Sequence, residues 1–148
     1  MTGSLTIRPY QPSDEIDCLA LFDENCPAYF APNERADYLR FLTERTLHYR
    51  VCLLEDRVVG AFGVLPDEPQ GLALRWILLS PRVQGQGLGT RIMTQVLEIA
   101  RAREAAALYI GASHRSAPFF ERFGARETGR TAHGWGPGMH RVDMTLVP

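Results

Sequence analysis

The sequence has few cysteines, and they form no familiar motif. Cys18, Cys26 and Cys52 are an odd number, at spacings that match no zinc or redox site. We therefore expect reduced thiols and no bound metal, with Cys18 and Cys52 as small core residues. A catalytic cysteine is the second interpretation of the same residues.

The sequence also lacks an excess of charge and a long apolar run. Its 16 basic and 17 acidic residues give a formal net charge of -1, without a block of like charge. This balance argues against nucleic acid and against a membrane surface as partners. The apolar runs are shorter than the roughly 18 residues of a membrane helix, and residues 1–4 lack the basic and apolar parts of a targeting segment. We therefore expect a soluble, cytoplasmic protein.

What the sequence does contain is a regular succession of strand and helix patterns. With 148 residues and 45% apolar content, the chain is long enough for a full core, and we expect one domain over residues 1–148. The expected strands are 5–8, 48–54, 58–65, 72–79, 106–112, 126–131 and 141–147. The expected helices begin at Ser13, at Asn33, after the glycines of 85–89, and near Pro118.

Two segments carry more detailed expectations. Ser13 is the expected cap of the first helix, in which Ile16, Leu19 and Ala20 share a face at three- and four-residue spacing. Between the last two strands, residues 133–140 are too rich in glycine for regular structure. We expect a loop there.

A glycine-rich turn is the most informative stretch of the sequence. Gly85, Gly87 and Gly89 follow an apolar strand and precede the best-patterned helix. Glycines permit left-handed dihedrals, and the free amides of a helix start favour a phosphate. A P-loop would need Gly-Lys-Ser/Thr, and a dinucleotide fingerprint would need glycine where Thr90 stands, so neither fits. The strand, turn, helix and next strand form a βαβ unit, whose strands should be parallel.

What remains, Gln84-x-x-Gly87-x-Gly89, resembles the acetyl-coenzyme A pyrophosphate loop of the GNAT superfamily of N-acetyltransferases. These proteins commonly carry a later segment, Asn-x-x-Ala-x-x-Phe/Leu-Tyr-Glu-Lys-x-Gly-Phe. The chain matches that segment in register at Phe119, Glu121, Arg122 (for lysine) and Gly124. The resemblance implies an α/β (α+β) fold with a central mixed, mostly antiparallel sheet of about seven strands, splayed at a parallel pair and flanked by about four helices.

The resemblance also implies acetyl-coenzyme A (acetyl-CoA) as co-substrate, bound where the two parallel strands splay apart. Leu79 would hold the pantetheine through its main chain, and nearby backbone amides would polarise the thioester carbonyl. Ser113 takes the place of the family's asparagine. The implied cofactor-binding residues are Leu78, Leu79, Gln84, Gly85, Gln86, Gly87, Leu88, Gly89, Thr90, Ser113 and Phe120.

One residue departs from the family pattern at a position that bears on catalysis. Phe120 stands where relatives often have the tyrosine that serves as general acid, and phenylalanine cannot donate a proton. Three explanations are open: the thiolate, with a reference pKa of about 8.5, leaves without an acid; a neighbour substitutes for the tyrosine; or the protein only binds the cofactor. The candidate neighbours are Ser113, Ser116, His114 and Tyr109.

The base that would deprotonate the amine is equally open, so no catalytic residue is assigned. Strand 72–79 offers Arg75 and Trp76 where many relatives place a carboxylate. Tyr29, Phe30 and Trp135 line either an acceptor pocket or the core. The candidate bases are Glu24, Glu34, His133 and His140, with a surface or structural role as the alternative for each histidine.

The leading hypothesis is an enzyme that transfers an acetyl or other acyl group from a coenzyme A thioester to a primary amine. A catalytically silent acyl-CoA sensor is the alternative, motivated by Phe120 and the missing strand carboxylate. A glycine-loop domain without cofactor is the third. The acceptor, a small-molecule amine or a peptide, is not readable from the sequence, and edge strand 141–147 is compatible with a homodimer.

Overall fold

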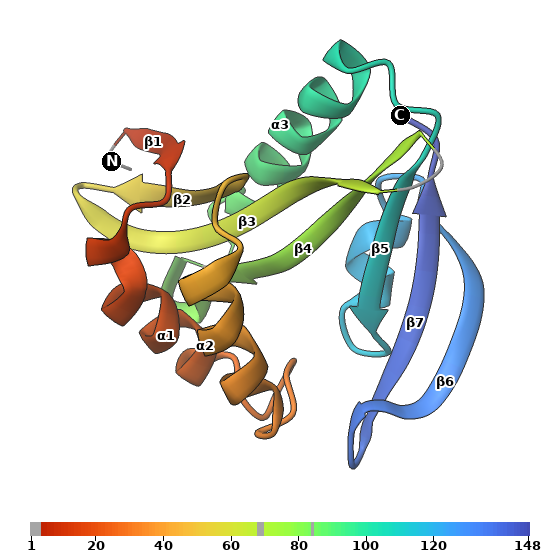
Figure 1. The fold of residues 1–148 in the computed structure, drawn as a ribbon, viewed down its shortest axis with the longest axis horizontal. Helices are drawn as coiled ribbons and strands as arrows, with labels where there is room; N and C mark the ends of the chain where they lie inside the picture. The colour runs from red at the N-terminus through yellow and green to blue at the C-terminus, as the bar shows by residue number, and fades with distance from the viewer. Residues whose placement is uncertain (1–3, 68–69, 84) are drawn as a thin grey trace.

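Seven strands among the described residues form one mixed sheet (Figure 1). This computed structural model describes residues 4–67, 70–83 and 85–148. The strands lie in the order β1-β2-β3-β4-β5-β7-β6, and of these neighbours only β4 and β5 are parallel. Segment 141–147 was wrongly predicted to be an edge strand, because it pairs with a strand on each side. Their bounds are β1 Leu5–Pro9, β2 Tyr49–Leu54, β3 Arg57–Asp67, β4 Gly71–Leu79, β5 Leu108–Ser113, β6 Arg126–Gly136 and β7 Met139–Leu146.

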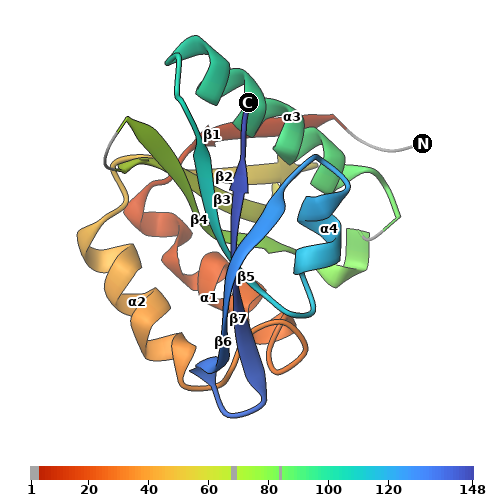
Figure 2. The same ribbon diagram turned by 90° about the vertical axis from the view of Figure 1, so that its right-hand side faces the viewer.

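Helices cover both faces of the sheet (Figure 2). The helices α1 (Glu15–Glu24) and α2 (Glu34–Glu44) lie on one face, and α3 (Leu88–Ala102) and α4 (Ala117–Glu121) lie on the other. Short 3-10 turns, Pro12–Asp14 and Pro81–Val83, precede α1 and follow β4. Within the described residues, seven strands with one parallel pair and four α-helices confirm the expected fold class.

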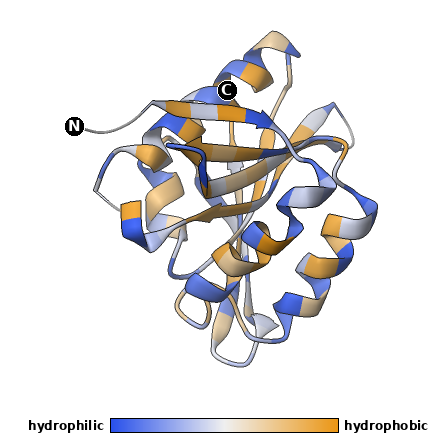
Figure 3. Ribbon diagram, turned by 90° about the vertical axis from the view of Figure 1, so that its left-hand side faces the viewer, coloured by the Kyte–Doolittle hydropathy of each residue, from blue (hydrophilic) through white to orange (hydrophobic). Residues whose placement is uncertain are grey.

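Each helix layer packs on the sheet through its own apolar core. On one side α3 buries Ile92, Met93 and Val96. On the other, Phe22 and Tyr38 of α1 and α2 pack in the cluster that includes strand β2. Burial contributes about 1.5–3 kcal/mol for each large apolar side chain. In Figure 3 the central strands are accordingly largely orange, whereas α1 and α2 also carry blue segments.

The parallel strands β4 and β5 pair over only a short stretch and then diverge. Their register is Leu72 with Leu108, Ala73 with Tyr109, and Leu74 with Ile110. Beyond Leu74, β4 has an extra residue relative to β3, and Trp76 has a φ of 48°. A bulge of this kind bends the strand and ends regular pairing on that side. The bend in β4 therefore opens a gap between the two strands.

The first helix differs from the expected one in its start and in its buried face. It begins after the turn Pro12–Asp14, and it buries Cys18, Leu21 and Phe22. Ile16 is 79% exposed, so the face that contains it was wrongly predicted. The reason is Asp14, which is buried and accepts two hydrogen bonds from the Arg8 guanidinium at 2.8 and 2.9 Å. This ion pair fixes the rotation of the helix relative to the sheet.

The segment 133–140 was wrongly predicted to be an irregular loop. Strand β6 continues to Gly136 and β7 starts at Met139, so a long hairpin turns tightly through Pro137 and Gly138, with a register shift between Thr131 and Gly136. Gly138 has a φ of 77°, which a tight turn requires and glycine adopts without cost. The glycines here serve a hairpin turn and close packing, and the strands continue up to it.

Candidate active site

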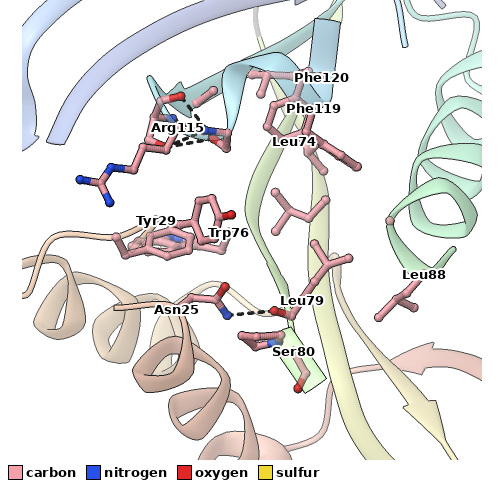
Figure 4. Close-up of a pocket in the computed structure, with 18 of the residues that line it drawn as sticks. Asn25, Tyr29, Leu74, Trp76, Leu79, Ser80, Leu88, Arg115, Phe119 and Phe120 are labelled. Carbon is pink, nitrogen blue, oxygen red and sulfur yellow. Dashed lines mark hydrogen bonds between the residues drawn. The ribbon is translucent and has the colours of Figure 1, made fainter. Parts of the chain in front are cut away.

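A cavity of about 610 Å³ occupies the gap between the diverging strands β4 and β5. One end is lined by the glycine turn, the start of α3 and helix α4. The other end is lined by the segment between α1 and α2, the β4 bulge and the β6–β7 hairpin. Figure 4 shows residues of both ends around one space, with Leu79 between them.

The glycine turn leaves its backbone open to this cavity. Gly87 is the residue immediately before α3 and has a φ of 76°, and Gly85 has a φ of 83°. A Cβ atom at either position would meet nothing within 4 Å, so free space lies over the backbone. At Gly89 the reason for glycine differs, because a Cβ would lie 2.8 Å from the ring of Phe119. The turn thus presents the start of a 15-residue helix to the cavity, where an anion is favoured.

Most of the expected cofactor residues lie on the cavity wall. Leu78 instead points into the core under α1 and is 1% exposed, and the exposed Gln86 is not among the lining residues. Gln84 lies outside the described residues. Those that line the cavity are Leu79, Gly85, Gly87, Leu88, Gly89, Thr90, Ser113 and Phe120.

Several lining residues were not anticipated from the sequence. Pro81 and Val83 belong to the 3-10 turn after β4, Ser80 immediately precedes it, and Pro81 was the available signal for the turn. Asn25 is 6% exposed and donates hydrogen bonds to the carbonyls of Leu21, at 2.8 Å, and Leu79, at 3.0 Å (Figure 4). Asn25 therefore connects the end of α1 to the end of β4.

Two serines face the cavity beside Phe120. The Ser116 amide donates to Ser113 Oγ at 3.1 Å, and the Ser113 amide donates to Ser116 Oγ at 3.0 Å. The Ser116 hydroxyl has only a long 3.4 Å contact with the Ser113 carbonyl and a shared 3.1 Å contact with the Ser113 hydroxyl. Phe120 is 3% exposed and packs against Phe119, with ring centroids 5.1 Å apart. Ser113 and Ser116 are therefore the hydroxyls at this wall, whereas Tyr109 lines a second cavity of about 230 Å³.

The carboxylate that lines the cavity is Glu34, the first residue of α2. It is 4% exposed, and its Oε2 accepts a hydrogen bond from the Ala31 amide at 2.8 Å. Burial raises the pKa of Glu34 to about 7, with Asp37 adding to the rise and the Ala31 amide opposing it. Glu24 is placed differently, because its carboxylate pairs with Arg82 at 2.8 Å outside the cavity lining.

Aromatic side chains surround the Glu34 end of the cavity. Tyr29, Phe30, Trp76 and Trp135 all line it, so both tryptophans of the chain face this space. The Phe30 and Trp76 rings stack with centroids 6.0 Å apart. The Trp135 indole donates to the Ala112 carbonyl at 2.8 Å, which fixes its orientation. Tyr29, Phe30 and Trp135 thus line the cavity, and Phe30 also packs against the core cluster under α1 and α2.

The histidine candidates lie along the β6–β7 hairpin and its neighbour β5. The Nδ1 atoms of His114, His133 and His140 each accept a backbone N–H, from His140, Gly138 and His133 respectively. Each imidazole then carries its proton on Nε2 when neutral. None of the three lines the main cavity. In the described ranges, no group of three or more His, Cys, Asp or Glu is arranged to hold a metal ion.

Two of the three thiols lie in the core. Cys18 and Cys52 are buried core residues, as predicted, and burial raises the pKa of each thiol to about 12. Cys26 is partly buried. No helix in residues 4–67, 70–83 and 85–148 is both long and apolar enough to cross a membrane.

Solved structures share this architecture over nearly the whole chain. Ard1 from Thermoplasma volcanium has a TM-score of 0.81 at 16% identity, covering 97% of both chains. A protein assigned to the GNAT family of acetyltransferases from Desulfovibrio desulfuricans has a TM-score of 0.79 at 20% identity, covering 97% of this chain and 99% of its own. YncA from Salmonella typhimurium, with acetyl-CoA as its cofactor, has a TM-score of 0.73 at 16% identity, covering 98% and 94%. These likenesses define the fold as that of GNAT proteins.

The sequence itself assigns the family. The model of the acetyltransferase (GNAT) family matches residues 18–125, which contain the glycine turn, both diverging strands and α4. The chain belongs to the GNAT family of acetyltransferases. None of the curated proteins matches the sequence significantly.

Proposed function

We propose that this protein transfers the acetyl group of acetyl-CoA to the primary amine of an acceptor, by direct attack within a ternary complex. The observation that carries the proposal is the continuity of the cavity. It extends from Gly85, Gly87 and Gly89 at one end to Glu34 and the two tryptophans at the other. A pyrophosphate site and an acceptor site therefore share one space, with the diverging strands between them.

The cofactor end suits the shape and charge of coenzyme A. The backbone over Gly85 and Gly87 is open, and the amides of Leu88 to Thr90 have no partner within the first turn of α3. These amides would hold the pyrophosphate. The pantetheine would then lie along the end of β4, where Leu79 lines the cavity and its carbonyl is already fixed by Asn25.

In the reaction, an acceptor ammonium first loses a proton to become nucleophilic. Glu34 would receive this proton, because its buried carboxylate lines the acceptor end and its pKa is raised to about 7. The amine lone pair then forms a C–N bond with the acetyl carbon, and the C–S bond breaks. The amide nitrogen releases its second proton and the thiolate takes one up. The overall products are the acetylated amine, free thiol and one proton.

The thiolate would leave beside the Ser116 hydroxyl, without a tyrosine as general acid. A serine hydroxyl is too weak an acid to protonate a thiolate, but it can donate a hydrogen bond to one. The weak intramolecular contacts of the Ser116 hydroxyl leave it free to turn toward the leaving sulfur. The missing general acid then costs the rate less than the roughly 10²–10⁴-fold of a full acid contribution.

Calorimetric titration with acetyl-CoA tests the cofactor end. We expect the wild type to bind and Gly87→Val to lose at least about tenfold in affinity, because the new side chain fills the space over the turn. Gly138→Val is the matched control, since Gly138 also has a left-handed φ, 77°, and open surroundings but lies outside the cavity lining. Equal loss in both variants, or in neither, would contradict the assignment of the turn.

A further inference from the structure

The acceptor end of the cavity has one acidic side chain among the described lining residues, beside aromatic rings and the cationic side chains of Arg75 and Arg115. Glu34 is the acidic residue among the described lining residues. Its Oε2 accepts the Ala31 amide, and no hydrogen bond from a described residue reaches its Oε1. Oε1 is not among the buried atoms without a partner in the described residues, so this oxygen is open to the cavity that Glu34 lines. A cation or N–H donor of an acceptor can therefore reach it, and the low dielectric of the site strengthens that contact.

The walls around this carboxylate favour a flat or bulky apolar group. Trp76 stacks on Phe30, and its ring centroid lies 4.9 Å from that of Tyr38 in the core. These two rings hold the Trp76 side chain in place. Trp135 is held by its bond to Ala112 and by the Arg141 guanidinium, 4.6 Å from its ring centroid. Aromatic rings offer apolar contact and also attract cations to their faces. A polyamine would place its further ammonium groups beside these rings and beside Arg75 and Arg115 without an acidic partner, and the α-carboxylate of a free amino acid would lie against the Glu34 carboxylate.

Two hydrogen bonds cross the acceptor end and limit the size of what can enter. Asn33 Nδ2 donates to the Trp135 carbonyl at 2.8 Å, joining the start of α2 to the hairpin. Arg115 Nη1 donates to the Ala28 carbonyl at 3.2 Å, joining the start of α4 to the α1–α2 segment. Figure 4 shows Arg115 on the opposite side of the cavity from Asn25, with Tyr29 between them. These bridges favour a compact ligand over a chain that passes through.

We infer that the acceptor is a small primary amine on an apolar, ring-sized body. Its ammonium group lies against Glu34, and its body lies between Trp76, Trp135 and Tyr29. This inference rests on the proposed function, because it assigns the acceptor half of the same cavity. It excludes polyamines, free amino acids and peptide termini as preferred acceptors.

Tryptophan fluorescence measures this binding without turnover, because both tryptophans line the cavity. The protein is titrated with phenethylamine, and separately with 3-phenylpropionate, spermidine, phenylalanine and the peptide Phe-Gly-Gly. We expect phenethylamine to saturate the signal and to bind at least about tenfold more tightly than each of the other four. Tighter binding of the acid, the polyamine, the amino acid or the peptide would overturn the inference.

Glu34→Gln tests the role of the carboxylate. Glutamine keeps the acceptor for the Ala31 amide but removes the charge, so phenethylamine affinity should fall at least about tenfold. Glu44→Gln, at the exposed far end of α2, is the matched control and should leave affinity unchanged. If Glu34→Gln does not fold, Tyr29→Ala replaces it, because Tyr29 is 41% exposed and contributes little to the core. Its loss should lower the affinity for phenethylamine several-fold. Unchanged affinity in the folded variant contradicts the inference.

Failure of this inference is separable from failure of the proposed function. Thiol release from acetyl-CoA with spermidine or phenylalanine, but not with phenethylamine, would retain the transferase and overturn the acceptor class. Saturable phenethylamine binding that depends on Glu34, without acetyl-CoA binding or thiol release, would retain the amine site and overturn the transferase.

Discussion

At the residue scale, Glu34 combines two effects that oppose each other. Burial against aromatic walls makes its charge unfavourable, which is why its pKa rises to about 7. The same burial strengthens any interaction with an acceptor cation, because the effective dielectric constant is low. Stability of the free protein and affinity for the acceptor should therefore change in opposite directions when this charge is removed.

Glu34→Gln should stabilise the free protein at alkaline pH. The folded-state pKa of Glu34 lies above its ordinary value of 4.5, so its contribution to stability is fully present below pH 4.5 and is lost as the pH rises through 7. At pH 8 we expect the variant to be more stable than the wild type by on the order of 2 kcal/mol, and at pH 5 by much less. Urea denaturation at both pH values measures this. A variant that is less stable at pH 8 would mean that the carboxylate is satisfied by the fold itself.

Ser116→Ala should slow acetyl transfer without lowering the affinity for acetyl-CoA. The hydroxyl would stabilise the leaving thiolate by a hydrogen bond to a charged atom, which contributes about 1.5–3 kcal/mol. We expect kcat to fall about tenfold, with an unchanged calorimetric Kd for acetyl-CoA. Ser116→Thr keeps the hydroxyl and should restore most of the rate. Equal rates for the alanine and threonine variants would exclude Ser116 from this role.

Phe120→Tyr tests the same step, the departure of the thiolate, by adding a phenol hydroxyl at the cavity wall. If the thiolate leaves with only a hydrogen bond from Ser116, a new phenol should change the rate by less than about tenfold. Steady-state thiol release measures the effect. A rise of several orders of magnitude would show that the native protein lacks an acid that it needs.

At the element scale, the β6–β7 hairpin is the element that closes the acceptor end. A Cβ on Gly136 would come within 2.6 Å of Ala31 Cβ and would also collide with the Asn33 side chain. Gly136 is therefore required for the close approach of the hairpin to the start of α2. The Asn33–Trp135 bond then fixes the tryptophan in the cavity wall.

Gly136→Ala should weaken acceptor binding while sparing the cofactor. The added methyl group pushes the hairpin away and displaces Trp135, so phenethylamine affinity should fall at least about fivefold. Acetyl-CoA affinity should stay within about twofold, because the glycine turn is at the other end of the cavity. Gly129→Ala on the same strand is the control, since its Cβ would make only an ordinary 3.6 Å contact with Asp143. Parallel losses of both ligands would indicate a general loss of structure.

The same hairpin should loosen on acidification. Burial and the neighbouring His114, His133 and Arg130 lower the pKa of His140, whose Nδ1 accepts the His133 amide. A lowered folded-state pKa contributes stability that is present above about 6.5 and lost as the pH falls below it. We expect amide exchange at His133, corrected for intrinsic rates, to accelerate between pH 7 and pH 5.5. An exchange rate without this pH dependence would mean that the imidazole bonds do not hold the hairpin.

Local patterns in the sequence predicted elements well, and long-range contacts explain where they failed. The apolar spacing of α3 and the proline and glycine that bound α4 act within a few residues, so these helices were correctly predicted. The rotation of α1 depends on the Arg8–Asp14 pair, and the bulge at Trp76 depends on pairing with β3. Neither contact leaves a periodic signal in the sequence.

The candidate site divides in the same way. The glycine turn was readable because three glycines before a helix imply a particular backbone. Glu34, Asn25 and Trp135 come together from α2, the end of α1 and the hairpin, so only the fold distinguishes Glu34 from the other candidate bases. A phosphate site formed by one segment is therefore easier to predict from the sequence than an acceptor site formed by three separate segments.

At the scale of the whole molecule, the divergence of β4 and β5 creates the cavity in which we propose that two substrates meet. The sheet is continuous from β1 to β4 and from β5 to β6, and the two parts stay joined by the short parallel pairing near Leu72–Leu74. Helices from both faces close the gap, α1 and α2 on the acceptor side and α3 and α4 on the cofactor side. Each substrate would enter from its own face and meet the other at the bend of β4.

The most direct test of this account is thiol release from acetyl-CoA in the presence of the amine panel. The chain has no lysine, so acetylation of its own lysine side chains cannot supply the thiol. The account predicts release with phenethylamine that is saturable in both substrates, is reduced by Gly87→Val and Glu34→Gln, and is retained by Glu44→Gln. Tight acetyl-CoA binding without thiol release for any amine would contradict it.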